Sequence, residues 1–110
     1  SMDINEYQQM ARRTAIYPNA GQNMTYPTLG LAGEAGEVAE KVKKVIRDKD
    51  GVFDDDARAA ISKELGDVLW YVAQIASELG LDLSNVAQGN LDKLADRAKR
   101  GTIKGNGDNR

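Results

Sequence analysis

The stretch Gly30–Asp48, GLAGEAGEVAEKVKKVIRD, decides the fold. Its apolar residues recur every three or four positions, which predicts an amphipathic helix. The apolar stripe consists of Leu31, Ala35, Val38, Val42, Val45 and Ile46. Two acids, Glu34 and Glu37, lie on one flank of this stripe, because a helix advances about 100° per residue. Two carboxylates therefore lie at the edge of the buried face of the predicted helix.

The stretch Ile61–Leu79, ISKELGDVLWYVAQIASEL, repeats this arrangement. Its stripe consists of Ile61, Leu65, Val68, Val72, Ile75, Ala76 and Leu79. Glu64 and Asp67 lie on its flank, again three residues apart. Two helices that pack by these stripes would bring the four carboxylates together.

The rest of the chain predicts two more helices and no strand, which makes the fold all-α. A short first helix runs to about Thr14, and a loop follows over about Ala15–Tyr26, where Pro18, Gly21 and the following Pro27 interrupt regular structure. Such a long loop is either a site of function or a plain surface connection. The expected helix N-caps are Asp3 with Glu6 as its capping-box partner, Thr28, one of Asp54–Asp56, and Ser84. We expect a single domain over residues 1–101 and a flexible polar tail over 102–110.

Composition excludes several classes of function. The 110 residues carry a net charge of −2, and no apolar run approaches the roughly 18 residues of a membrane span. We therefore expect neither a nucleic-acid nor a membrane partner, and we expect a cytoplasmic protein. Cysteine and histidine are both absent, which removes disulfides, catalytic triads and the common zinc sites. Any metal must be held by oxygen ligands, which favour Mg²⁺ or Mn²⁺.

The predicted acid cluster requires a counter-charge, because neighbouring carboxylates repel one another in a partly buried site. A divalent cation supplies it and favours a substrate with phosphate oxygens. The fourth helix offers a matching polar stripe, Asn90, Lys93 and Arg97, beside its apolar stripe of Ala87, Leu91, Leu94 and Ala98. Two simpler interpretations remain open: the acids pair with lysines such as Lys41, and Arg97 compensates the helix dipole.

Trp70 lies about 180° from Ile61 on the predicted third helix. Both faces of this helix therefore require burial. We expect a homo-oligomer that buries Trp70 between chains.

The segment GEAGEVAEKVKK, followed about thirty residues later by ELGDVLWY, resembles the MazG-like nucleoside triphosphate pyrophosphohydrolases of the all-α NTP pyrophosphatase superfamily. The family pattern is an E-E-x-x-E helix and then an E-x-x-D helix. Here Gly33 replaces the first acid, whereas Glu34, Glu37, Glu64 and Asp67 match the others. Tyr71 matches a substrate-contacting position, and Asn90, Lys93 and Arg97 match a family N-x-x-K-x-x-x-R stretch associated with substrate phosphates.

The resemblance implies a four-helix MazG-like bundle that assembles as a dimer or a dimer of dimers. It implies hydrolysis of a (d)NTP to the (d)NMP and pyrophosphate by a water activated by Mg²⁺ or Mn²⁺, with the four acids as catalytic and metal-binding residues. The alternatives are a dUTPase-like enzyme or a phosphoribosyl-ATP pyrophosphohydrolase of the same fold, or a non-catalytic helical interaction module.

Overall fold

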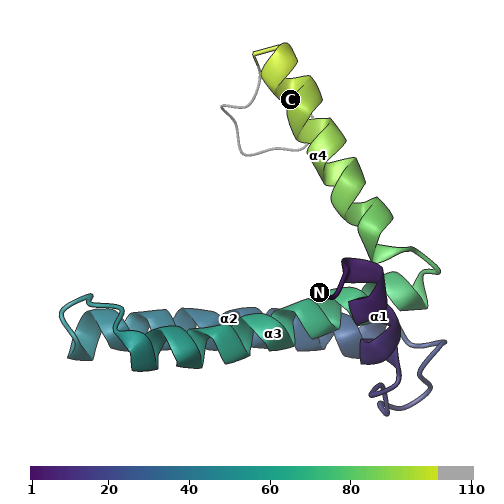
Figure 1. Ribbon diagram of the computed structural model, residues 1–110. Helices are drawn as coiled ribbons and strands as arrows, with labels where there is room; N and C mark the ends of the chain where they lie inside the picture. Colours follow the sequence, from purple (N-terminus) through teal and green to yellow (C-terminus); the bar gives the residue numbers. More distant parts are fainter. Residues whose placement is uncertain (102–110) are drawn as a thin grey trace.

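The computed structural model describes residues 1–101, and four helices account for most of them. They are α1 (Ile4–Arg12), α2 (Thr25–Asp48), α3 (Asp55–Glu78) and α4 (Leu83–Lys99). The long helices α2 and α3 form an antiparallel hairpin, α1 crosses one end of it, and α4 departs from that end (Figure 1). The predicted all-α class of four helices is confirmed. The predicted tail, 102–110, lies outside the described residues.

Two of the predicted helix starts are confirmed by hydrogen bonds. Asp3 and Glu6 form the expected capping box at α1. Asp54 caps α3, where its side chain accepts a hydrogen bond of 2.8 Å from the Ala57 N–H. Lys49 also binds Asp54 at 3.0 Å, so capping and one ion pair account for this aspartate.

The predicted start of α2 at Thr28 is wrong. The helix begins three residues earlier, at Thr25, and contains Pro27 in its first turn. Proline is tolerated there because the first N–H groups of a helix have no partner within it. The Asn23 side chain supplies one partner instead, by accepting a hydrogen bond of 3.0 Å from the Tyr26 N–H.

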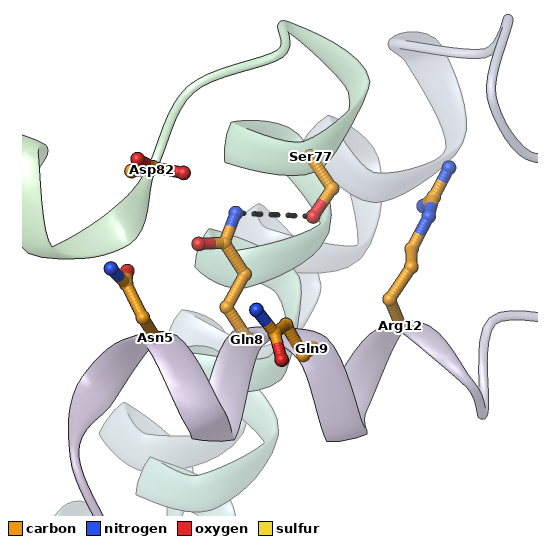
Figure 2. Close-up of a pocket in the computed structure, with 6 residues that line it drawn as sticks. All are labelled: Asn5, Gln8, Gln9, Arg12, Ser77 and Asp82. Atoms are coloured by element: carbon orange, nitrogen blue, oxygen red, sulfur yellow. Dashed lines mark hydrogen bonds between the residues drawn. The ribbon is translucent and has the colours of Figure 1, made fainter.

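The predicted cap of α4 at Ser84 is also wrong. The helix begins at Leu83, and its caps come from α1: Gln8 accepts from the Leu83 N–H at 2.7 Å, and Asn5 accepts from the Ser84 N–H at 3.1 Å. Figure 2 shows Asn5 and Gln8 extending from α1 toward the turn that joins α3 to α4. These hydrogen bonds attach the start of α4 to α1.

The core lies where α1 crosses α3. Ala73, Ala76 and Leu83 are buried there, with Ile4, Tyr7 and Val72 packed around them. The predicted stripes are wrong at four positions, because Ala35, Ile46, Leu65 and Leu79 are exposed. Helix α3 lies between α2 and α1, so the face buried in its last turns is centred on Ala73 and Gln74 instead.

The apolar stripe predicted for α4 is exposed over its whole length. Leu91, for example, retains 59% of its accessible surface. Only the first turns of α4 meet α1, and the rest of the helix points away from the hairpin (Figure 1). One chain alone therefore leaves α4 outside a closed bundle.

Trp70 is half-buried within its own chain, so its ring has partners without a second copy, and its place in an interface between chains stays a prediction. The indole N–H donates to the Thr14 hydroxyl at 2.8 Å, and Tyr17 and Tyr71 pack edge-on against it. The segment after α1 thus covers part of the face of α3 that the sequence left without a partner, while Leu69 on that face stays exposed. No helix among residues 1–101 is long and apolar enough to cross a membrane.

Candidate metal and active site

Three of the four predicted acids meet between α2 and α3. Glu34 from α2 and Glu64 and Asp67 from α3 each offer a carboxylate oxygen, and these oxygens lie within 4.8 Å of one another. The antiparallel hairpin produces this meeting because it places the flank of one long helix beside the flank of the other. We call Glu34, Glu64 and Asp67 the acid cluster.

The electrostatics of the acid cluster are unfavourable without a cation. The Glu64 carboxyl has the largest effect in raising the pKa of Glu34, because the two carboxyls are close enough to share a proton. Burial and the charges of Asp67 and Glu37 raise this pKa further. Glu34 Oε2 is buried and has no hydrogen-bond partner. A buried acceptor of this kind is costly to leave unsatisfied, so the site is suited to a ligand.

Glu37 lies one turn further along α2 and is exposed, outside the three-residue group. Its charge still contributes to raising the pKa of Glu34. The nearby lysines Lys43 and Lys44 pair with Glu40, at 2.9 and 3.7 Å. Within residues 1–101, the ion pairs recorded involve none of the four predicted acids, so the structure does not favour the simpler ion-pair interpretation.

The donor set fits a hard divalent cation. Oxygen ligands bound at about 2.0–2.6 Å from one ion lie up to about 5 Å apart, which agrees with the observed spacing of 4.8 Å. The cluster offers only oxygen and carries the negative charge that such an ion neutralises. Glu34, Glu64 and Asp67 are therefore the residues that could hold Mg²⁺ or Mn²⁺.

Tyr71 lies beside the acid cluster, as its predicted role requires. Burial raises the pKa of Tyr71, as do Tyr26 and the charges of Glu34 and Asp67. The Tyr71 ring packs directly on Gly30, where an added Cβ would collide with the ring carbons. Only glycine at position 30 leaves room for the tyrosine in this place.

Tyr71 begins a continuous series of rings that we call the aromatic row: Tyr71, Trp70, Tyr17 and Tyr26. Trp70 meets Tyr71 edge-on with centroids 5.1 Å apart, and Tyr17 meets Trp70 at 6.4 Å. Tyr26 stacks on Tyr17 at 5.0 Å with an interplanar angle of 12°. The row therefore joins the acid cluster to the loop between α1 and α2.

The predicted phosphate-binding stripe is not brought to the acids within one chain. Asn90, Lys93 and Arg97 lie on α4, which points away from the hairpin (Figure 1). Asn90 is exposed, Lys93 is half-buried and Arg97 is buried. A single chain thus places the acids and this stripe on separate elements.

A polar groove of about 470 Å³ lies between α1 and the turn after α3. It is lined by Asn5, Gln8, Gln9, Arg12, Ser77 and Asp82 (Figure 2) and includes none of the acids. Gln8 donates to Ser77 at 3.2 Å and to the Leu81 carbonyl at 2.8 Å, so its amide serves the turn. We assign this groove to the attachment of α4.

Sequence reasoning missed a second buried carboxylate, Glu78. Its side chain is 1% exposed and accepts from the Tyr17 hydroxyl, the Gly21 and Asn23 N–H groups, and Arg12. The Tyr17 hydrogen bond, followed by those from the two backbone N–H groups and Arg12, lowers the pKa of Glu78 to about 2. A signal was available, because an acid in the last turn of a helix opposes the helix dipole.

Comparison with known proteins gives a family match for most of the chain. Residues 22–102 match the MazG nucleotide pyrophosphohydrolase domain. The chain belongs to this family. It is also similar to the gene 37 protein of Mycobacterium phage L5, at 54% identity over 114 residues that cover 99% of this chain and all of the relative. No solved structure matches the chain.

Family membership confirms the resemblance drawn from the two acid motifs, and the match includes the acid cluster, Tyr71 and α4. Gly33, which replaces the first acid of the family pattern, faces open space: a Cβ there would meet nothing within 4 Å. The fold therefore does not require glycine at this position.

Proposed function

We propose that this protein is a metal-dependent nucleoside triphosphate pyrophosphohydrolase, which converts a (d)NTP and water to a (d)NMP and pyrophosphate. The observation that carries the proposal is the meeting of three acids from two helices around a buried carboxylate oxygen without a partner. Membership of the MazG nucleotide pyrophosphohydrolase family supports the class of reaction.

In this proposal Glu34, Glu64 and Asp67 hold Mg²⁺ or Mn²⁺, and Glu37 adds negative charge from the next turn. When bound, the cation would neutralise the acids, polarise the phosphoryl group and lower the pKa of the attacking water. The water oxygen forms a bond to the α- or the β-phosphorus, the anhydride bond between these two phosphorus atoms breaks, and the protons of the water pass to solvent, which gives the (d)NMP and pyrophosphate.

Tyr71 is the substrate-binding residue that this chain places beside the acids. Its phenol is fixed against Gly30, so it presents a constant surface to a nucleotide held at the acid cluster. Asn90, Lys93 and Arg97 would grip the phosphates, with Arg97 as a fork and Lys93 as a point charge. Because α4 points away from its own hairpin, we propose that the stripe acts on the site of a second copy.

Exposed apolar surface supports an assembly of this kind. Leu91 and Leu94 on α4, and Leu65 and Leu69 on α3, are all exposed. An apolar groove of about 220 Å³ lies beside the start of α4. It is lined by Leu31, Val72, Ile75, Ala76, Leu79, Leu81, Leu83 and Val86. Contiguous apolar surface of this kind is typical of an interface, and a dimer or a dimer of dimers would cover it.

Release of pyrophosphate from a panel of ribo- and deoxynucleoside triphosphates tests the activity. We expect release that requires Mg²⁺ or Mn²⁺ and ceases in the Glu64→Gln variant, while the matched surface variant Glu40→Gln behaves as the parent. Folded parent protein that releases no pyrophosphate from any nucleotide with either metal would refute the proposal.

Mixing two inactive variants tests the shared site. Glu34→Gln removes an acid and Lys93→Ala removes a stripe residue, and random mixing of chains in a dimer restores one complete site in half of the molecules. We expect about one quarter of the parent activity to return after the two are unfolded and refolded together. If the mixture stays inactive although both variants assemble, the stripe serves its own chain or has no role.

A further inference from the structure

We propose that Glu78 is a positioning residue, which holds the loop 13–24 against α3 and thereby fixes the aromatic row beside the acid cluster. Its consequence for substrate binding rests on the proposed function; its consequence for the loop does not. Glu78 lies eleven residues from Asp67 on α3, so it acts through other side chains and not on the reacting atoms.

Glu78 connects the loop to α3 at several points. Its Oε2 accepts from the Gly21 N–H at 2.7 Å and from the Tyr17 hydroxyl, and its Oε1 accepts from the Asn23 N–H at 3.0 Å. Gly21 has a backbone φ of +102°, a conformation that residues other than glycine rarely adopt. The loop is therefore shaped so that its backbone donors converge on one carboxylate.

Arg12 at the end of α1 completes this arrangement. It binds Glu78 at 3.1 Å, donates to the Tyr17 hydroxyl at 2.8 Å, and donates to the Gln74 amide oxygen at 2.8 Å. Gln74 is fully buried. The ion pair of Arg12 and Glu78, with the neutral Tyr17 and Gln74 beside it, thus joins α1, the loop and α3 at a single place.

The loop segment held in this way carries Tyr17, one ring of the aromatic row. Tyr17 is buried, stacks on Tyr26 and presents its edge to Trp70. Thr14 accepts the hydrogen bond of the Trp70 indole. Release of the loop would therefore remove two contacts of Trp70 at the same time.

Trp70 passes this constraint to the active site. Its ring packs edge-on against Tyr71, the ring that Gly30 supports beside Glu34. The path from Glu78 to the acid cluster runs through Tyr17, Trp70 and Tyr71 and is made of direct contacts. A loosened loop would leave the acids in place, because α2 and α3 hold them, and would misplace the surface that meets the substrate.

The chain contains one tryptophan, so its fluorescence reports on this path without any substrate. The experiment measures acrylamide quenching of Trp70 and the steady-state kinetics of parent, Glu78→Gln, Tyr17→Phe and the surface control Glu40→Gln. Far-UV circular dichroism confirms that each variant is folded. Tyr17→Phe keeps the ring and removes only the hydroxyl that donates to Glu78, so it tests the same connection with a smaller change.

We expect quenching of Trp70 to rise at least about twofold in Glu78→Gln and by less in Tyr17→Phe, as its cover opens. We expect KM to rise roughly tenfold in Glu78→Gln with kcat within about twofold, since binding surface and not the acid cluster is disturbed. A folded Glu78→Gln with the quenching and KM of the parent would overturn the proposal. Should Glu78→Gln fail to fold, parent-like quenching and KM in Tyr17→Phe would overturn it.

If the parent itself releases no pyrophosphate, the proposed function fails, and the quenching results alone decide whether Glu78 holds the loop.

Discussion

Glu34 and Glu78 are two carboxylates on the same helical hairpin, and their surroundings shift their pKa values in opposite directions. Glu78 accepts hydrogen bonds from Tyr17, Gly21, Asn23 and Arg12, and its pKa is lowered to about 2. Glu34 faces other acids, has a raised pKa, and keeps one buried oxygen without a partner. The chain stabilises the charge of the first and leaves the charge of the second to a ligand.

In the two proposals above, this difference separates a structural acid from a functional one. Buried polar groups in proteins are satisfied in the great majority of cases, so an exception requires an explanation. Glu78 has its explanation within the chain, in the loop that it holds. In the proposed function the acid cluster finds its explanation in a divalent cation, which fits the oxygen ligands.

The largest expected effect comes from removing the functional charge. Glu34→Gln should lower kcat/KM on the order of 10³-fold, about 4 kcal/mol, because the cation that stabilises the transition state loses a ligand. Circular dichroism should show an unchanged fold. A variant that keeps kcat/KM within about threefold of the parent would show that Glu34 holds nothing the reaction needs.

The next effect concerns the structural charge. Because the pKa of Glu78 is lowered to about 2, its contribution to stability is complete above the unfolded pKa near 4.5 and is lost as pH falls toward 2. Chemical unfolding at several pH values should show this loss in the parent. Glu78→Gln should lower the free energy of unfolding by roughly 3 kcal/mol at pH 7, since Arg12 is left beside a neutral group. If the parent and Glu78→Gln lose the same unfolding free energy as the pH falls, the loss arises from other carboxylates.

Glu34 should respond to pH with the opposite sign. Its folded pKa is raised, so without metal the repulsion it suffers is present at neutral pH and is relieved as pH falls through the folded pKa. Metal-free Glu34→Gln should therefore be at least as stable as the parent at pH 7, and the two should converge in acid. A metal-free variant less stable than the parent at pH 7 would show that the Glu34 charge is satisfied after all.

The smallest effect is expected at Gly33, which lies next to Glu34 and faces open space. Gly33→Glu supplies the acid of the family pattern. A better helix former should add up to about 1 kcal/mol of stability, and repulsion within the site should offset part of it without metal. The stabilisation by added Mn²⁺, measured as a shift in Tm, should exceed that of the parent; an equal or smaller shift would show that this position does not reach the site.

The sequence predicted the parts of this molecule that depend on local pattern. Spacing alone placed Glu34, Glu64 and Asp67 on facing flanks, because helical periodicity fixes the direction of a side chain. It failed where elements far apart in the chain meet. The caps that Gln8 and Asn5 provide for α4 join residues 75 and 79 positions apart, and Trp70 is partly covered by a loop that the pattern could not position.

Glu78 shows the same limit within the site. Its place in the last turn of α3 was unusual for an acid, yet its partners lie on α1 and on the loop, so only the fold reveals them. The exposed stripe of α4 is the converse case. Its pattern was correctly identified as apolar, but one chain does not supply the surface that covers it.

Calorimetric titration of Mn²⁺ into the parent, Glu34→Gln and Glu78→Gln tests the central claim most directly. The account predicts that the parent binds Mn²⁺, that Glu78→Gln binds it with an affinity within about threefold of the parent, and that Glu34→Gln binds it at least about tenfold more weakly. Equal binding by the parent and Glu34→Gln, or no binding by the folded parent, would contradict the assignment of a metal to the acid cluster.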